Sequence, residues 1–160
     1  MTDGLLIRPA VEADAAVIAR LANQLSRHEG LGDEVFSAAR ILEDGFGDAP
    51  AFSVLLAELA GEAVGYALYQ DFYNTDLACR GLWLSDLFVV EAARGRRIGR
   101  KLLAEVARRA VEIGACSVWW GVRSANLGAR AFYAALGARD EDARILELDR
   151  PALEALAEET

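Results

Sequence analysis

Apolar and polar residues follow two different spacings along this chain, and each change of spacing marks an expected strand or helix. Residues 5–10 form a short apolar run that Pro9 stops, which predicts a strand. From Asp14 to Leu25, apolar residues recur every three or four positions, the spacing of a helix that buries one face. Ser37 is placed to cap a second helix over 38–44, with Gly45 at its C-terminal end.

The middle of the chain predicts paired strands. Residues 51–59 and 63–72 are strand-like runs, and the short AGE segment between them predicts a hairpin that turns at Gly61. Residues 82–90 predict another strand, whose apolar run is interrupted by Ser85 and Asp86. Because successive side chains of a strand alternate, we expect Ser85 and Asp86 to point to opposite faces of the sheet.

Helices and strands are interleaved in the second half. The pattern predicts a helix from Ile98 to Ile113 that ends at Gly114, and a central strand over 116–122 that is apolar on both faces. A helix over 129–136, a strand over 144–149 and a last helix opened by Pro151 complete the order. Without linkers or repeats, this order predicts one mixed α/β domain over residues 1–160.

Composition limits the classes of function. Seventeen Lys and Arg against 25 Asp and Glu give a net charge of −8, which disfavours a nucleic-acid partner and is compatible with a small cationic substrate. Uncharged apolar runs are too short for a membrane span, and the acidic N-terminus is unlike a secretory signal. Two cysteines, Cys79 and Cys116, and one histidine suggest neither a disulfide framework nor a metal centre. We therefore expect a metal-free cytoplasmic protein.

Positive charge is nevertheless concentrated directly before the helix at 98. Residues 94–101 hold five of the 17 basic side chains around Gly95 and Gly99. A helix N-terminus exposes free backbone N–H groups, glycines allow a ligand to approach them, and arginines bind phosphate with paired hydrogen bonds. These features favour a pyrophosphate site, although charge alone is equally consistent with a solvated helix start. The segment has neither a P-loop Lys-Ser/Thr pair nor the GxGxxG spacing of dinucleotide-binding folds.

Two stretches of sequence carry a family resemblance. RGRRIGRKLL after an apolar strand resembles motif A of the GCN5-related N-acetyltransferase (GNAT) superfamily, with Arg94 and Gly99 at matching positions and Arg97 in place of a glycine. NLGARAFYAALGA, residues 126–138, resembles its second cofactor motif. LEDGFG, LIRPA, SRHEG and LSDLFVV are similar to the spermidine/spermine (diamine) acetyltransferase branch.

The resemblance implies a fold and a cofactor, acetyl-coenzyme A (acetyl-CoA). The expected fold is α/β (α+β): a mixed, largely antiparallel twisted sheet, flanked by helices and splayed between its two middle strands. Main-chain groups of the strand before motif A would bind the pantetheine arm, a backbone N–H near Phe88 would polarise the acetyl oxygen, and Asn126 would meet the pantetheine from the other side. The cofactor residues implied are Leu87, Phe88, Val89, Arg94, Gly95, Arg96, Arg97, Ile98, Gly99, Arg100 and Asn126.

The resemblance also implies catalytic and substrate-binding residues. Tyr133 would donate a proton to the departing sulfur, although spacing alone is more typical of a core aromatic. Ser85 occupies the position of the branch's glutamate base and cannot hold the amine proton itself, so we expect it to order a water. Asp86, Glu29 or prior loss of the proton to solvent are the alternatives. The substrate-binding residues implied are His28, Glu29, Ser85, Asp86 and Trp119.

The expected function is acetyl transfer from acetyl-CoA to a primary amine, with a polyamine or small diamine as the first candidate. Arg97, Ser85 and the shorter 141–146 segment depart from the branch and leave open a diamino acid, a protein amine or a catalytically weak acyl-CoA-binding or sensing module. A nucleic-acid or protein-binding domain that uses the 94–101 face is a further alternative, disfavoured by the net charge. By analogy with the branch we expect a homodimer.

Overall fold

The computed structural model describes residues 4–32 and 34–159, and they form two compact units that divide after Trp120. Each unit is described by itself. The expectation of a single domain stays a prediction. None of the helices in the described ranges is long and apolar enough to span a membrane.

The first unit contains a five-stranded sheet in the order β1-β2-β3-β4-β5. The first four strands pair antiparallel and β5 pairs parallel to β4. This arrangement confirms the expected mixed, largely antiparallel sheet. The strands are β1 Leu5–Pro9, β2 Ser53–Leu59, β3 Glu62–Asn74, β4 Cys79–Val89 and β5 Ser117–Trp119.

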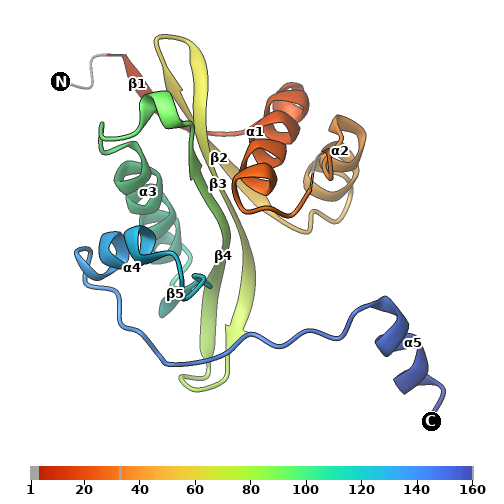
Figure 1. Ribbon diagram of the computed structural model, residues 1–160. Helices are drawn as coiled ribbons and strands as arrows, with labels where there is room; N and C mark the ends of the chain where they lie inside the picture. The colour runs from red at the N-terminus through yellow and green to blue at the C-terminus, as the bar shows by residue number, and fades with distance from the viewer. Residues whose placement is uncertain (1–3, 33, 160) are drawn as a thin grey trace. The chain divides into compact units, whose positions relative to one another are not determined.

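Helices cover both faces of this sheet (Figure 1). Helices α1 (Ala15–His28) and α2 (Ala38–Phe46) pack on one face, and α3 (Ile98–Glu112) packs on the other. Neighbouring residues of β2 enter different cores: Leu56 joins the α1 side and Leu55 the α3 side, and both are almost fully buried. Burial of a Leu side chain stabilises the fold by about 2 kcal/mol, so the sheet is held from both faces.

Helix ends follow local chemistry. The Ser37 hydroxyl accepts a hydrogen bond from the Arg40 N–H at 3.2 Å and caps α2 as predicted, but the helix runs past Gly45 to Phe46, and Gly47 follows it. Helix α3 ends before Gly114, which has a φ of +70° that glycine adopts at little cost.

The sheet splays between β4 and β5. The two strands pair only from Gly81 to Trp83, whereas β4 continues to Val89. The strand predicted over 116–122 is therefore short, because a strand lasts only where its neighbour continues the hydrogen-bond ladder. The splay lies between β4 and the edge strand β5, and it leaves an open edge along the second half of β4.

A disulfide bond joins Cys79 at the start of β4 to Cys116 just before β5, with Cα atoms 6.2 Å apart. This bond corrects the sequence-based expectation, because two cysteines separated by 37 positions carry no signal that the fold brings them together. Next to it, the Cys116 N–H donates to the Arg80 carbonyl at 2.9 Å and Asn74 donates to the Ser117 hydroxyl at 3.0 Å. The disulfide bond and these two hydrogen bonds together hold the start of β5 against β3 and β4.

The second unit contains α4 (Leu127–Ala134) and α5 (Arg150–Ala157). Asn126 accepts from the Ala129 N–H at 3.0 Å and Asp149 accepts from the Ala152 N–H at 3.0 Å, so each helix starts on a capping side chain. The predicted last helix, with Pro151 in its first turn, is confirmed. The predicted strand over 144–149 is wrong: these residues have no regular structure, and Leu146 is 89% exposed. Alternation makes a strand only where a neighbouring strand pairs with it.

Candidate active site

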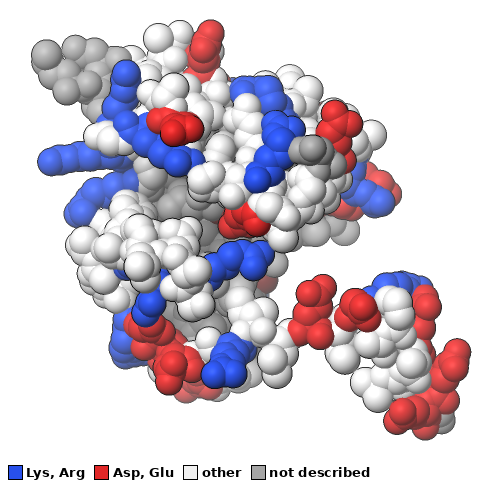
Figure 2. Space-filling model, in the orientation of Figure 1, with Lys and Arg blue, Asp and Glu red and all other residues white. Residues whose placement is uncertain are grey.

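Two buried anchors hold the basic loop in front of α3. After β4 ends at Val89, Ala93 and Ile98 are both buried, whereas the basic side chains between and after them are exposed. Figure 2 shows Lys and Arg side chains gathered over the region where α3 begins. Arg94 is held there because its Nε donates to the Val89 carbonyl at 3.0 Å. The exposed basic residues of this loop are Arg94, Arg96, Arg97, Arg100 and Lys101.

The main chain of this loop suits a diphosphate group. Gly95 has a φ of +79°, and no atom lies within 4 Å of the position that a Cβ would take, so a ligand can approach closely. Arg97 stands at the N-cap of α3 with a φ of +60°, the left-handed conformation in which a glycine is favoured. The first turn of α3 has no side-chain cap, which leaves its N–H groups for an anion. Ile98, Gly99 and Arg100 form this turn.

The predicted pantetheine-binding residues lie on the open edge of β4. Leu87, Phe88 and Val89 pair with Ala67, Tyr66 and Gly65 of β3, respectively, and β5 pairs with none of them. Main-chain groups of this segment that point away from β3 can therefore bind an extended ligand. The structure brings these residues and the basic loop together in one continuous piece of chain.

A β-bulge at Ser85 changes the expected direction of Asp86. The β3–β4 register shifts between Leu68 and Tyr69, so that Leu84 and Asp86 have partners and Ser85 is the extra residue. Leu84 before it and Leu87 after it both pack on the α3 side, which means that the alternation is reset by one position. Asp86 consequently lies on the α1 face with Phe88.

The Ser85 side chain makes a hydrogen bond on the α1 face as well. Its hydroxyl donates to Gln70 Oε1 at 2.8 Å, and Gln70 follows Tyr66 and Leu68 in the alternation of β3 on the α1 face. The expectation of opposite faces for Ser85 and Asp86 is therefore wrong, because alternation does not survive a bulge. Ser85 is exposed and does not line the cavity described next.

A cavity of about 270 Å³ on the α1 face contains two carboxyl groups, Glu29 and Asp86. Most of its wall is apolar, from α1 and the segment that follows it. The other lining residues are Ala22, Leu25, Ser26, Leu31, Val35 and Phe36. A cavity of this kind can bind a cation that carries an aliphatic chain, because the carboxylates attract the charge and the walls accept the methylene groups.

Asp86 is held by Tyr66, a residue that the sequence analysis did not select. The Tyr66 hydroxyl donates to Asp86 Oδ2 at 2.7 Å, and the Tyr66 ring is fully buried. Burial raises the pKa of Asp86, the Tyr66 hydrogen bond acts against that rise, and the Glu29 charge adds to it. Burial raises the pKa of the Tyr66 phenol, and the neighbouring Asp86 raises it further. The hydroxyl therefore stays protonated and remains a hydrogen-bond donor. The available signal was a tyrosine hydroxyl within the apolar run 63–69 of β3.

The remaining predicted substrate residues are dispersed. Glu29 lies at the C-terminal end of α1 next to His28, but His28 does not line the cavity. Trp119 is in β5, where its ring packs against Phe72 with centroids 5.4 Å apart. The structure thus unites Glu29 and Asp86 and leaves His28 and Trp119 outside their cavity.

Tyr133 and Asn126 belong to the second unit. Tyr133 lies in α4, its ring contacts that of Phe132 with centroids 5.2 Å apart, and burial raises the pKa of its phenol. Asn126 caps the same helix. Their roles toward the acetyl group and the pantetheine stay predictions.

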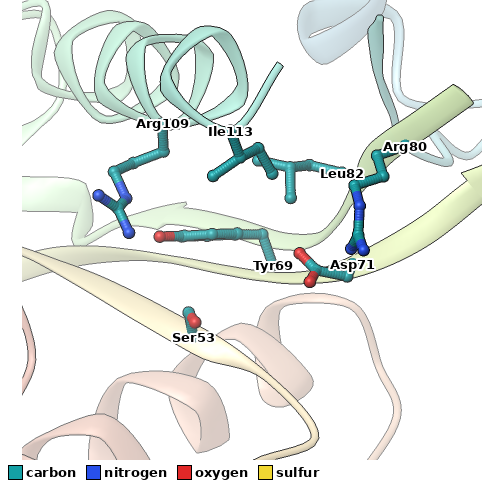
Figure 3. A pocket seen from close by; sticks show the side chains of 7 residues that line it. All are labelled: Ser53, Tyr69, Asp71, Arg80, Leu82, Arg109 and Ile113. Atoms are coloured by element: carbon teal, nitrogen blue, oxygen red, sulfur yellow. The ribbon is translucent and has the colours of Figure 1, made fainter. Parts of the chain in front are cut away.

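A further cavity, of about 400 Å³, lies on the α3 face and was not predicted. In Figure 3 the Asp71 carboxylate and the Arg80 guanidinium lie close together, and the Tyr69 hydroxyl points toward Arg109. This cavity is lined by two arginines and one aspartate, so the Glu29–Asp86 cavity, whose lining has no basic residue, is better suited to an ammonium group. Among the described residues, no cluster of His, Cys, Asp and Glu could hold a metal ion.

Comparisons with known proteins agree with this geometry. The model of the acetyltransferase (GNAT) family matches residues 19–138. The thialysine N-epsilon-acetyltransferase of Bos taurus is 37% identical over 145 residues, which cover 85% of each chain. The spermidine/spermine N(1)-acetyltransferase-like protein 1 of Homo sapiens is 31% identical over 146 residues, which cover 86% of this chain and 21% of that protein.

Solved structures show the same fold. An integron cassette protein from the mobile metagenome of V. cholerae superposes with a TM-score of 0.82 at 21% identity, over 96% of this chain and 98% of that one. The ribosomal-protein-alanine N-acetyltransferase of Brucella melitensis gives a TM-score of 0.74 at 21% identity, over 91% and 99%. Because the family match covers most of the chain and the bovine relative is 37% identical over 85% of each chain, this protein is an N-acetyltransferase that belongs to the acetyltransferase (GNAT) family and resembles its diamine acetyltransferase branch.

Proposed function

We propose that this enzyme transfers an acetyl group from acetyl-CoA directly to a primary amine of a small diamine or polyamine. The observation that carries the proposal is the pair of carboxyl groups, Glu29 and Asp86, in a mostly apolar cavity. Asp86 is followed at once in β4 by the open strand edge, Leu87–Val89, and then by the basic loop. One stretch of chain therefore carries one carboxyl group of the acceptor site, Asp86, and the residues of the donor site.

The residues of the basic loop fit the diphosphate of acetyl-CoA. Its arginines, the open backbone at Gly95 and the uncapped first turn of α3 supply positive charge and N–H donors. When bound, acetyl-CoA supplies an acetyl thioester. A main-chain N–H near Phe88 that meets the acetyl oxygen would lower the barrier by about 3 kcal/mol.

The acceptor cavity favours an ammonium group with an aliphatic chain. The two carboxyl groups attract the cation, and the side chains of Leu25, Leu31 and Phe36 accept methylene groups. The relatives' names agree with this chemistry, because thialysine and spermidine both carry primary amines on flexible chains.

Proton transfers are assigned to two residues. Asp86 accepts the proton of the ammonium group in preference to Ser85, because a serine hydroxyl cannot accept an additional proton at neutral pH and Ser85 does not line the cavity. Tyr133 donates a proton to the departing sulfur. The raised pKa of Tyr133 keeps its phenol protonated and ready to donate.

An amine panel tests the function. The purified protein is incubated with acetyl-CoA and a linear diamine, a polyamine, a diamino acid, a monoamine of equal length or a lysine peptide, and released thiol is measured. We expect the highest kcat/KM for the diamine or polyamine, and a fall of about tenfold in Glu29→Gln with the diamine. Coenzyme A binding by calorimetry without turnover of any amine would instead identify a binding or sensing module. Light scattering tests the proposed homodimer.

A further inference from the structure

We propose that Tyr66 is a positioning residue for amine transfer: its hydroxyl orients Asp86 and keeps it ionised, so that Asp86 takes a proton from the bound ammonium group. This inference rests on the proposed function. It explains how a chain with Ser85 in place of a glutamate still presents a base to its acceptor.

The geometry brings the two side chains together from neighbouring strands. Asp86 pairs with Leu68 in the β3–β4 register, and Tyr66 lies two residues before Leu68, on the same face of the sheet. The Tyr66 ring is fully buried and contacts the Phe88 ring with centroids 6.4 Å apart. Because the ring is fixed by packing, its hydroxyl holds Asp86 Oδ2 in one place, at 2.7 Å.

The bulge at Ser85 makes this contact possible. Leu82 and Leu84 point to the α3 side, and uninterrupted alternation would send Asp86 there as well. The extra residue reverses the direction, and Asp86 reaches the α1 face and the cavity that contains Glu29. The bulge therefore supplies the carboxyl group to the acceptor site, and Tyr66 fixes it there.

The charges around Asp86 make its ionisation depend on Tyr66. Among the described residues that line the cavity, Glu29 from the end of α1 is the other ionisable group, and Tyr66 faces Asp86 from β3. The cavity residues from α1 and the 31–36 segment otherwise carry no charge. Burial and Glu29 both favour the neutral acid, whereas the Tyr66 hydrogen bond favours the carboxylate.

Asp86 takes one proton from the bound ammonium group. One N–H bond of the ammonium group breaks, and its proton forms a new O–H bond on Asp86. The electron pair stays on nitrogen, which becomes a neutral nucleophile with two protons. Asp86 becomes a neutral acid and later releases the proton to solvent. A carboxyl group already protonated before the amine binds could perform neither this step nor the attraction of the cation.

Tyr66→Phe tests the inference, because it removes one hydroxyl and keeps the buried ring. The matched control is Tyr69→Phe, which removes a hydroxyl from the opposite face of the same strand. In Tyr66→Phe we expect the acidic limb of the kcat/KM profile for the amine to move up by about 1 pH unit. On that limb kcat/KM should fall about tenfold and recover at higher pH, with KM for acetyl-CoA unchanged. Tyr69→Phe should match the parent enzyme.

An acidic limb that stays in place in Tyr66→Phe, or that moves equally in both variants, would overturn the inference. A second measurement does not depend on turnover. Carboxyl-carbon NMR, with the Asp86 signal assigned from Asp86→Asn, should show a higher pKa for Asp86 in Tyr66→Phe than in the parent. An unchanged pKa would reject the role of Tyr66 even if the enzyme acetylates amines, and a raised pKa in a protein that acetylates none would reject only the proposed function.

Discussion

Arg97 combines backbone strain with a proposed role in phosphate binding. It occupies the position at which the family motif has a glycine, and it adopts the left-handed conformation that glycine favours, with a φ of +60° and a ψ of 16°. A side chain in this region costs about 1 kcal/mol or more. The extra guanidinium is exposed beside the uncapped first turn of α3, where the proposed diphosphate site would gain positive charge from it.

Replacement of Arg97 by glycine separates these two effects. We expect Arg97→Gly to raise the free energy of unfolding by about 0.5 kcal/mol, because relief of strain exceeds the entropy that glycine adds to the unfolded chain. The affinity for coenzyme A should fall by less than about tenfold, as for loss of one exposed cation. Urea unfolding and calorimetry measure the two quantities. Arg96→Gly, also exposed but without a positive φ, should lose affinity and stability together; a stability gain there would contradict the strain argument.

A substitution at Tyr133 tests separately whether this residue is the proton donor to the departing sulfur. We expect Tyr133→Phe to lower kcat for the best amine by about 100-fold, because a positioned general acid contributes at least that much, while the Kd of acetyl-CoA is retained. Steady-state kinetics and calorimetry measure these changes. Tyr73→Phe, which removes a phenol from an exposed part of β3, is the matched control. An unchanged kcat in Tyr133→Phe would remove the assignment.

At the scale of elements, one arginine joins three segments at the edge of the first unit. Arg8 of β1 donates two hydrogen bonds to Asp14, at 2.7 and 2.9 Å, and two to Glu58 of β2, at 2.6 and 3.0 Å. Asp14 also accepts from the Val11 N–H at 2.8 Å, which fixes the turn that leads into α1. Side chains of this network are less than a third exposed, so solvent screens it only partly.

This network makes stability depend on pH. Hydrogen bonds from Arg8 hold the pKa of Asp14 below its ordinary value. The stabilisation is therefore complete above about pH 4, the ordinary value for an aspartate, and is lost as the pH falls through the depressed value of the folded state. We expect Arg8→Met to lower the free energy of unfolding by about 2 kcal/mol at pH 7, because it leaves two carboxylates without their partner.

Denaturant unfolding of both proteins from pH 7 to pH 2 measures this difference, which should shrink toward the acid end. A difference that is constant over the range would contradict the assignment. Arg40→Met is the control: Arg40 pairs with Glu43 and Asp44 on the surface of α2, is 62% exposed, and should change stability by less than about 0.5 kcal/mol at any pH.

At the scale of the whole molecule, the disulfide closes a long loop of the first unit. The loop between Cys79 and Cys116 contains most of β4, the basic loop and α3. The disulfide bond also holds β4 and β5 together at the end where the two strands pair. A cross-link of this kind stabilises chiefly by restricting the unfolded chain, and for a loop of 37 residues the effect is about 4 kcal/mol.

We expect the Cys79→Ser, Cys116→Ser double variant to unfold at a lower denaturant concentration, with a loss of about 3–4 kcal/mol. Addition of a thiol reductant should bring the parent protein to the same midpoint and leave the double variant unchanged. A parent midpoint that does not respond to reductant, once thiol titration shows that the bond is open, would contradict the expected stabilisation.

Local patterns were sufficient for most elements of the first unit. The periodicity of α1 and α3, the Ser37 cap and the hairpin at Gly61 depend on neighbours a few positions apart, and the structure confirms each of them. The basic loop was also visible, because its charge and glycines lie in one short stretch. The strand over 144–149 failed because its alternation needs a partner that its own residues cannot supply.

The amino-acid sequence by itself determined the helices, the hairpin, the basic start of α3 and the family resemblance, since all of these are encoded in spacing and in short motifs. Only the tertiary structure decided which way Asp86 points, that Tyr66 holds it, and that Cys79 meets Cys116. The physical reason is common to the three. A bulge, a cross-strand hydrogen bond and a disulfide each depend on which distant residues the sheet places opposite one another, and that register is a property of the packed strands and not of any one of them.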